Sequence, residues 1–494
     1  MSEAGGEAAA RDQGGEAMAG RKAIGFGLAG LGAAAVLVAG VAISPAGPYL
    51  AHALPVSAGI SAQMACAGVF VSGRDLDTVA RRDVRQLSPL TAINSYRLDR
   101  KARTVTVSVL GLSPRTAYYR PGVGCTLLVD ATPAQLDAQA AGLQPVQTAP
   151  RPAPQNAPWP LGDQVDLSHL PPGVDRAALD KAVSDAFTDD TPDHAIDTRA
   201  IVVVYDGQIV AERYAPGFDK TTRLLGWSMS KSVEATLVGI LAAQGRLDLD
   251  APAPVSEWRA PTDPRHAITP RQLLRMSSGL TFHEPYDPGT DSTRMLFESP
   301  DMGAYAAAKP LAHAPGTVWS YSSGTANILS RMVVQGSGGS LASAYAFAQS
   351  HLFGPAGMTS AVFEPDESGV FVGSSYLYAT ARDWARFGLI YLNGGTINGV
   401  RIVPQSFVDF VRTPAPADPV AGYGGQFWLN GRKNGQLQMP HLPADMVSAE
   451  GHNDEYVSIF PSRHAVIVRL GWTRVDGGFN RDRHFAAILA ALPR

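Results

Sequence analysis

The C-terminal part of the chain carries hydrophobic patterns typical of strands followed by helices. Apolar residues after position 232 recur at the spacing of one helix face, which predicts a helix that ends near Gly245. Upstream, apolar runs at 201–204 and 209–213 flank Asp206-Gly207, a pair typical of a tight β-hairpin. The apolar face of the predicted helix consists of Val233, Leu237, Ile240 and Leu241.

The remaining patterns divide the chain into segments. From about 60 to 143, short β-rich runs such as 104–110 and 125–129 alternate with turn residues, which predicts a small α+β extension. Six prolines lie between Pro145 and Pro160, a density that favours an extended linker. Residues 178–187 then have helical spacing. We therefore expect an extension at 46–144, a proline-rich linker at 145–175 and a large domain at 176–494.

The N-terminus contains a polar tail and an apolar segment. Residues 1–20 are rich in Gly, Ala and Glu without apolar periodicity, so we expect them to be disordered. In the segment 21–45, Arg21 and Lys22 precede an uncharged run whose length of about 20 residues spans a bilayer core. The positive-inside rule would leave everything after it outside the cytoplasm. A cleaved signal peptide, with a small-x-small site at Ala51-His52-Ala53, is the alternative.

Composition and charge exclude several classes of protein. The 494 residues are 45% hydrophobic and 17% charged, which excludes a largely disordered chain. The formal net charge of -3 and the lack of a long basic run exclude nucleic acid as an expected partner. The two cysteines, Cys66 and Cys125, form no zinc-binding pattern, and the 11 histidines show no ligand spacing. We expect no metal and no cofactor.

Ser228 and Lys231 are the strongest candidates for chemistry. Ser228 precedes the predicted helix, where free N–H groups favour negative charge, and Lys231 follows one turn later on the same face. A buried lysine with a lowered pKa can activate a serine hydroxyl. The alternative is a serine cap followed by a solvated lysine. Against it, only seven lysines stand beside 34 arginines, so a merely structural cation here would more often be arginine.

Ser228-x-x-Lys231 opens a series of segments that resembles the serine β-lactamase-related hydrolases. This family includes class C β-lactamases, penicillin-binding carboxypeptidases, related esterases and 6-aminohexanoate-oligomer hydrolases. Residues 268–280 resemble its Leu-Leu-x-x-x-Ser-Gly-Leu segment, and 315–323 resemble its Pro-Gly-x-x-x-x-Tyr-Ser-Asn block. Residues 378–387 are similar to the helix that follows. The resemblance covers about 195 to 494.

The resemblance implies both a fold and a catalytic set. The fold is of the α/β class (α+β type), an antiparallel sheet with helices on both faces plus a helical subdomain. Residues 457–460 and 465–470 would pair as late strands, and 482–492 would close the fold as a helix. Ser228 would be the nucleophile and Lys231 its base. Tyr321 would pass a proton to the leaving group.

Two departures from the family pattern concern substrate binding. Ser323 stands where the family often has asparagine, so a hydrogen bond to the substrate carbonyl is lost or replaced. The third motif, Lys-Thr-Gly or His-x-Gly, best matches the segment that begins Gly451-His452, with Asp454 at the usual glycine position. His452 would face the substrate or be structural. We expect a backbone N–H near Glu455 to join the Ser228 N–H as oxyanion donor.

These features predict a membrane-anchored, extracytoplasmic serine hydrolase that cleaves a small amide or ester through an acyl-enzyme. A non-catalytic binding or sensor protein on the same fold is the alternative. Outside the cytoplasm we expect Cys66 to pair with Cys125. Because histidine is mostly neutral at pH 7, His452 would hold a substrate carboxylate less well than lysine, and Asp454 and Glu455 would repel one. Open-chain esters and amides should therefore be better substrates than penicillins or cephalosporins.

Overall fold

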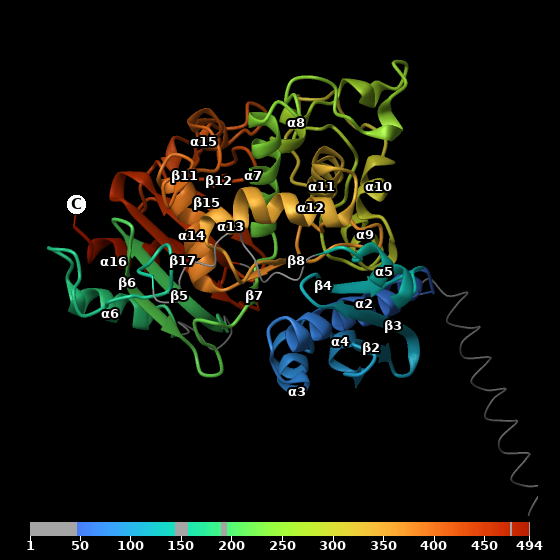
Figure 1. Ribbon diagram of the computed structural model, residues 1–494, viewed down its shortest axis with the longest axis horizontal. Coiled ribbons are helices and arrows are strands. Elements are labelled where there is room, and N and C mark those ends of the chain that lie inside the picture. The colour runs from blue at the N-terminus through green and yellow to red at the C-terminus, as the bar shows by residue number, and fades with distance from the viewer. Residues whose placement is uncertain (1–46, 144–156, 189–194, 475–476, 494) are drawn as a thin grey trace, which may run out of the picture. The chain divides into compact units, whose positions relative to one another are not determined.

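A six-stranded antiparallel sheet forms the centre of the C-terminal part of the protein. The computed structural model describes residues 47–143, 157–188, 195–474 and 477–493, so the predicted tail at 1–20 and the predicted membrane segment at 21–45 lie outside the described residues. The strand order is β12-β15-β16-β17-β5-β6 (Figure 1). The bounds are β12 Trp428–Leu429, β15 Val447–Gly451, β16 Glu455–Phe460, β17 Ala465–Gly471, β5 Thr198–Tyr205 and β6 Gln208–Tyr214.

Helices cover both faces of this sheet, and the alternation along β5 shows why. Val202 and Val204 pack into the apolar core that contains α7 and α14, whereas Ile201 and Val203 pack into a second core with α6 and α16. Successive side chains of a strand point to opposite faces, so a nearly continuous apolar run requires cover on both sides. The helix bounds are α6 Arg176–Asp185, α7 Met229–Ala243, α14 Ala381–Leu392 and α16 Arg481–Ala490.

The predicted elements of this layer are confirmed, with small changes of boundary. The β5–β6 hairpin turns at Asp206-Gly207, and both residues have the positive φ that this turn requires (49° and 79°). The late strands β16 and β17 pair antiparallel with Phe460 opposite Ala465. The helix predicted to end near Gly245 ends at Ala243.

A helical subdomain lies between β6 and the later strands. Its central helix, α11, contacts α7, α8, α9, α10 and α12. A small three-stranded sheet, β7-β9-β8, leads into α7. The bounds are α8 Pro270–Leu274, α9 Asp291–Glu298, α10 Met302–Ala307, α11 Ser323–Ser337, α12 Leu341–Ala348, α13 Gly354–Ala356, α15 Gln405–Arg412, β7 Leu224–Leu225, β8 Val362–Phe363, β9 Leu377–Ala379, β10 Thr396–Ile397, β11 Val400–Arg401, β13 Arg432–Lys433 and β14 Gln436–Leu437.

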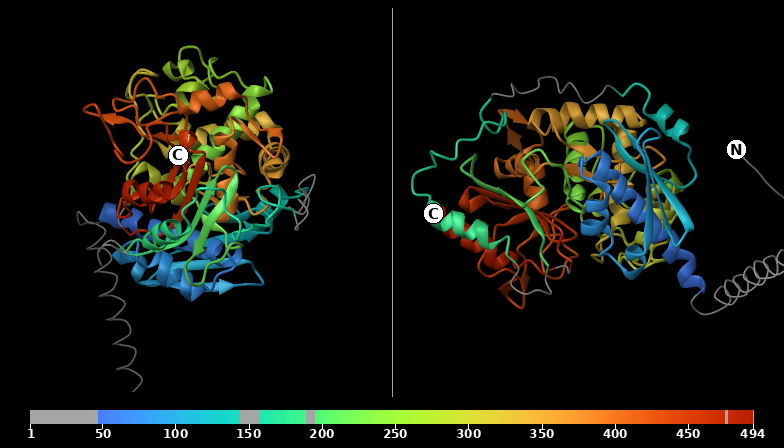
Figure 2. Two further views of the ribbon diagram at one scale, coloured as in Figure 1. Left: turned by 90° about the vertical axis from the view of Figure 1, so that its left-hand side faces the viewer. Right: turned by 90° about the horizontal axis from the view of Figure 1, so that it is seen from below.

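The N-terminal extension consists of a long helix on a four-stranded antiparallel sheet (Figure 2). Along β2, Val105, Val107 and Val109 are buried and alternate with more exposed residues, as expected of a sheet covered on one face. Cys66 on α2 and Cys125 on β4 form the predicted disulfide. The bounds are α2 Gly47–Phe70, α3 Leu76–Val79, α4 Pro89–Ala92, α5 Pro133–Gln139, β1 Asn94–Asp99, β2 Thr104–Val109, β3 Leu112–Arg120 and β4 Gly124–Leu128.

Helix α2 was not predicted from the sequence. Its apolar residues are spread over every side of the helix, so it has no single apolar face that a helical period could reveal. Among the described residues, α2 is the one helix that is long and apolar enough to cross a membrane. However, 83% of its most apolar 18-residue stretch is buried inside the protein. Its composition is therefore explained by packing.

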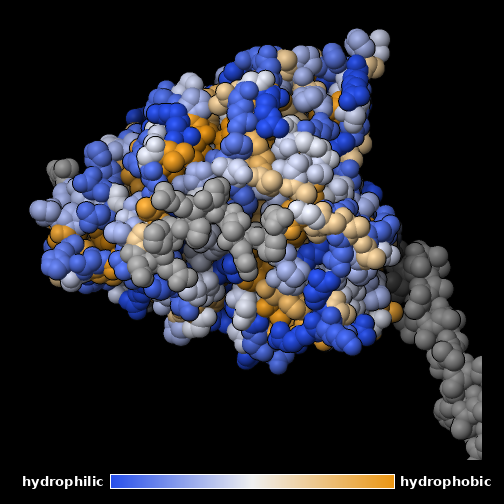
Figure 3. Space-filling model, viewed as in Figure 1, coloured by the Kyte–Doolittle hydropathy of each residue, from blue (hydrophilic) through white to orange (hydrophobic). Residues whose placement is uncertain are grey.

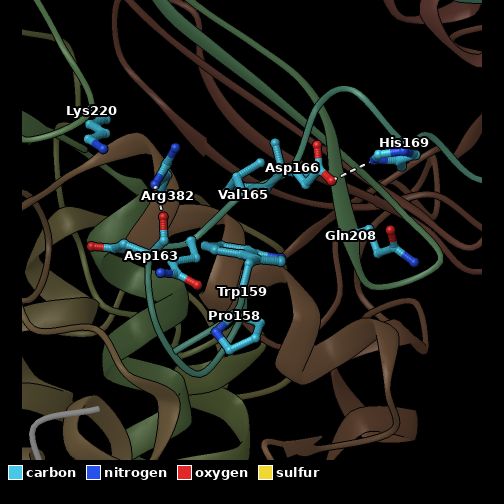
Figure 4. A pocket seen from close by; sticks show the side chains of 11 residues that line it. Pro158, Trp159, Asp163, Val165, Asp166, His169, Gln208, Lys220 and Arg382 are labelled. Atoms are coloured by element: carbon cyan, nitrogen blue, oxygen red, sulfur yellow. Dashed lines mark hydrogen bonds and ion pairs between the residues drawn. The ribbon is translucent and has the colours of Figure 1, made fainter. Parts of the chain in front are cut away.

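The described part of the predicted linker folds back on the large domain. Arg386 of α14 donates to the carbonyls of Pro160 and Gly162, and Trp159 donates to the carbonyl of Gly207. A pocket lies between this segment and the β5–β6 hairpin (Figure 4), and its lining includes none of the predicted catalytic residues. Residues 157–175 are thus packed against the domain, unlike the extended spacer that the prolines predicted. Polar residues cover most of the face drawn in Figure 3.

Candidate active site

Ser228 lies at the junction of the small sheet and α7. The backbone turns sharply before it, because Trp227 has a φ of 44°, a conformation that costs energy for a residue with a bulky side chain. Gly226 donates to the carbonyl of Leu377, and a Cβ at Gly226 would lie 2.2 Å from the ring of Trp384. Ser228 occupies the N-cap position of α7 without a side-chain capping bond, and the residue is partly exposed.

Lys231 is buried directly behind Ser228. Its side chain is only 1% exposed, and Nζ lies 2.9 Å from Ser228 Oγ, 3.2 Å from Ser323 Oγ and 2.8 Å from the carbonyl oxygen of Ser374. Burial lowers the pKa of Lys231 to about 8, although the nearby carboxylate of Glu284 opposes this shift. A substantial fraction of the amine is therefore neutral close to physiological pH.

Glu284 and Ser323 extend the hydrogen bonds of Lys231. The Ser323 hydroxyl donates to Glu284 Oε1 at 2.6 Å, and the Ser323 N–H donates to Oε2 at 2.7 Å. Burial raises the pKa of Glu284, opposed by the charge of Lys231 and by both bonds from Ser323. Ser323 is completely buried. Its hydroxyl is thus bonded inside the protein, and the substrate-binding role considered for Ser323 stays a prediction.

Tyr321 lies on the other side of Ser228. Lys231 Nζ is 4.9 Å from the centroid of the Tyr321 ring, and the Ser228 side chain is among the groups that act on the phenol. Burial, with the nearby Tyr423 and Glu284, raises the pKa of Tyr321 well above its ordinary value. The phenol therefore carries its proton. The structure places Ser228, Lys231 and Tyr321 side by side, as the sequence predicted. Their catalytic roles stay predictions.

His452 follows β15 at the turn to β16. Its ring meets Trp227 edge to face at 5.5 Å and stacks on Tyr286 at 5.8 Å, so it lies beside the residue that precedes Ser228. The close approach depends on Gly451, where a Cβ would lie 2.4 Å from the carbonyl oxygen of Gly226. The third segment of the motif thus borders the site as predicted.

The acidic residues after His452 are buried and hydrogen-bonded within the protein. The carboxylate of Asp454 accepts hydrogen bonds from the Tyr456 hydroxyl and from the N–H groups of Gly477 and Phe479. Glu455 is 1% exposed, and its Oε1 accepts from the Gly471 N–H. Both carboxylates are thus bonded inside the protein, and their effect on a substrate carboxylate stays a prediction. The backbone of Glu455 pairs opposite Gly451, and its role as oxyanion donor stays a prediction.

Aromatic residues surround Tyr321 on the side away from Lys231. Its ring lies 6.0 Å from that of Tyr423 and 5.5 Å from that of Trp428. Trp319 contacts the same two rings. We call Trp319, Tyr321, Tyr423 and Trp428 the aromatic wall. Sequence reasoning did not find Tyr423, Trp428, Glu284 or Ser374, because none of them lies in a motif with fixed spacing from Ser228.

A second Ser, His and Asp group occurs at the pocket of Figure 4. The Nδ1 atom of His169 lies 2.8 Å from Asp166 and 3.0 Å from the Ser168 hydroxyl. A catalytic triad needs one ring nitrogen for the serine and the other for the carboxylate, whereas here both contact the same nitrogen. This exposed group is therefore a turn, and it supplies a control for the experiments below. In the described part of the chain, no group of three or more His, Cys, Asp or Glu side chains is arranged to hold a metal.

Comparison with known proteins decides the family. A family model described as beta-lactamase matches residues 179–492. The chain belongs to this family. Its 6-aminohexanoate-dimer hydrolase relative from Paenarthrobacter ureafaciens is 27% identical over 307 residues, which cover 56% of this chain and 74% of that protein. The predicted serine hydrolase class is therefore confirmed.

Solved structures confirm the predicted fold. A candidate 6-aminohexanoate-dimer hydrolase from Bacillus anthracis superimposes with a TM-score of 0.52 and 23% identity, covering 64% of this chain and 83% of that one. A candidate β-lactamase from Bacteroides dorei DSM 17855 has a TM-score of 0.51 and 19% identity, covering 64% of this chain and 99% of that one. These matches show that the fold is of the β-lactamase and transpeptidase type.

Proposed function

We propose that the protein cleaves a small amide or ester through an acyl-enzyme on Ser228, with Lys231 as base and Tyr321 as proton donor. The observation that carries this proposal is the position of Lys231 Nζ, which is buried and 2.9 Å from Ser228 Oγ. A serine hydroxyl is a weak nucleophile until a base within hydrogen-bond distance takes its proton. A lysine can do so only when its pKa is lowered, as burial does here.

The three contacts of Nζ also orient its lone pair. A neutral amine has two protons and one lone pair. The Ser374 carbonyl can only accept, and the Ser323 hydroxyl already donates its own proton to Glu284. The two amine protons are therefore directed to Ser374 and Ser323. The lone pair is left for the proton of the Ser228 hydroxyl, which is the orientation that a general base requires.

The proposed reaction forms an ester on Ser228 and then hydrolyses it. Lys231 takes the proton from Ser228 Oγ as this oxygen attacks the substrate carbonyl carbon. The carbon–nitrogen or carbon–oxygen bond breaks, the leaving group takes a proton from Tyr321, and Lys231 returns a proton to Tyr321. Water attacks the ester on Ser228 in the second half, with the proton transfers reversed. The Ser228 N–H at the start of α7 would stabilise the oxyanion, together with the predicted donor near Glu455.

We propose an open-chain substrate. His452 replaces the lysine that gives the family's third motif a fixed positive charge, so a substrate carboxylate would be held less well. The aromatic wall offers apolar surface beside Tyr321, which would suit an uncharged chain next to the scissile bond. The relative named for hydrolysis of the 6-aminohexanoate dimer supports a linear amide.

We also propose that the enzyme works outside the cytoplasm. The Cys66–Cys125 disulfide is of a kind that persists in oxidising compartments, and the apolar run of 21–45 would anchor the chain or direct its export. The anchored and the cleaved forms differ in mass, so mass spectrometry of the protein from its native host separates them.

A fluorophosphonate probe tests the proposed nucleophile. The wild type should be labelled on one peptide, the one containing Ser228, and Ser228→Ala should abolish labelling. Ser168→Ala is the matched control, because Ser168 is an exposed serine that also contacts a histidine, and this variant should label like wild type. Lack of labelling in a folded wild type would favour the non-catalytic binding or sensor protein.

A further inference from the structure

The carbonyl that holds Lys231 belongs to a loop closed at its base. The Glu364 N–H donates to the carbonyl of Tyr376 at 3.0 Å, and the Glu364 carbonyl accepts from the N–H of Val372 at 2.9 Å. Ser374 lies between these contacts, and its carbonyl oxygen is 2.8 Å from Lys231 Nζ. The far side of the loop is held by α11, where Asn327 Oδ1 accepts from the Ser374 N–H at 3.2 Å. The backbone of Glu364 therefore ties together the two ends of the turn that carries the Ser374 carbonyl.

The side chain of Glu364 is held by the N-terminal extension. Oε1 accepts from the Cys125 N–H at 2.6 Å, and Oε2 accepts from Gln63 Nε2 at 2.7 Å. Gln63 also donates to the Cys125 carbonyl, so helix α2 and strand β4 bind the carboxyl group together. The Cys66–Cys125 disulfide joins the same helix and strand beside these bonds.

The Glu364 carboxyl group is buried, so water cannot replace its partners in the extension. Glu364 is 0% exposed, and a Cβ at Gly124 would lie 2.5 Å from Glu364 Cγ. Burial raises the pKa of Glu364 to about 8, opposed by the bonds from Cys125 and Gln63 and by the charge of Arg120 on β3. The carboxyl group stays buried because the extension supplies its donors.

We propose that Glu364 is a positioning residue, through which the N-terminal extension fixes the loop that holds Lys231 against Ser228. The chain of contacts runs from Gln63 and Cys125 to the Glu364 side chain, then through its backbone to Ser374 and Lys231. The extension is then a working part of the catalytic domain. This inference rests on the proposed role of Lys231 as base.

Paired substitutions in the full-length, disulfide-bonded protein test this chain of contacts. Glu364→Leu removes both acceptors at similar size and should lower kcat for a nitrophenyl ester by about 10- to 100-fold with little change in KM, as expected when a catalytic group is displaced. Glu364→Gln should keep most activity, because Gln63 can turn its amide to match. Gln63→Leu should lower kcat in the same direction by less, which keeps the test valid if Glu364→Leu does not fold.

The control is another carboxylate on the same loop. Glu367 accepts from the N–H groups of Val129 and Ala131 of the extension but has no backbone bond to Tyr376. Glu367→Leu should therefore lower thermal stability and leave kcat unchanged. Equal losses of kcat in Glu364→Leu and Glu367→Leu would show that docking of the extension in general matters, and would overturn the specific role of Glu364.

The pH profile supplies a readout that a merely structural role would not change. The Ser374 carbonyl stabilises the charged form of Lys231, so its displacement should move the acid limb of kcat/KM toward lower pH in Glu364→Leu and Gln63→Leu. Folded variants with the wild-type kcat and profile would refute the inference. Failure of the wild type itself to react with fluorophosphonate would instead refute the proposed function.

Discussion

Lys231 Nζ lies 2.9 Å from Ser228 Oγ, with Ser228 at the N-cap of α7 and Lys231 in its first turn. A helix brings residues three apart onto one face, so local backbone geometry places the two side chains on the same side. The helix is buried along most of its length and cannot shift without disturbing the core. The backbone that carries the proposed nucleophile and its base is therefore held in place by the core.

Loss of the deprotonatable amine should abolish turnover. Lys231→Arg keeps the positive charge but cannot act as a base, so we expect kcat to fall by several orders of magnitude. The double variant Ser228→Ala, Lys231→Arg should be little worse than either single variant, because the two groups act as one unit. Steady-state kinetics and fluorophosphonate labelling measure this. Retention of most activity by Lys231→Arg would contradict the mechanism.

Activity should rise with pH through the pKa of Lys231. The neutral amine is the active form, and burial places its pKa at about 8. The neutral fraction then increases about tenfold between pH 7 and pH 9, and kcat/KM should follow it. The measurement is kcat/KM for a linear amide between pH 6 and pH 10. A profile that is flat over this range would show that another group is the base.

Tyr321→Phe should affect amides more than activated esters. An amine leaving group needs a proton from the phenol, whereas nitrophenolate leaves without one. We expect kcat to fall much further for a short amide than for a nitrophenyl ester. Tyr423→Phe is the matched control, since Tyr423 contacts the Tyr321 ring and keeps that contact as phenylalanine. Equal losses on both substrates would remove Tyr321 from the proton transfer.

The disulfide should stabilise the protein by constraining the unfolded chain. Cys66 and Cys125 are 59 residues apart, and closing a loop of this size contributes about 2 to 4 kcal/mol. Urea unfolding with and without reductant measures the difference. The variant Cys66→Ser, Cys125→Ser should be insensitive to reductant. Identical free energies of unfolding for the oxidised and reduced wild type would refute the prediction.

Open-chain substrates should be preferred over β-lactams. Values of kcat/KM for a nitrophenyl ester, a short linear amide and a chromogenic cephalosporin decide this. His452→Lys should raise the rate on the cephalosporin relative to the ester, because it restores a fixed positive charge for the carboxylate. A clear preference of the wild type for the cephalosporin would show that carboxylate recognition survives without that lysine.

The elements that sequence reasoning located best are those with a local signal. The β5–β6 hairpin follows from Asp206-Gly207, and α7 follows from its apolar spacing up to Gly245. Helix α2 was not predicted because its apolar residues lie on every side and show no helical period. The packing of residues 157–175 was not predicted because Arg386, which binds this segment, is more than 200 residues away along the chain.

The sequence by itself determined the family, the proposed nucleophile with its neighbouring lysine and the disulfide pair, because these depend on residue type, on short motifs or on there being only two cysteines. Only the tertiary structure decided that Lys231 is desolvated, since its partner carbonyl at Ser374 lies 143 residues away along the chain. The same holds for Glu284, which accepts the hydrogen bond of the Ser323 hydroxyl across 39 residues of the chain. The tertiary structure also decided the partners of Asp454 and Glu455. Their carboxylates accept hydrogen bonds from the N–H groups of Gly477 and Gly471. Such contacts follow from how distant segments pack, and no local pattern encodes them.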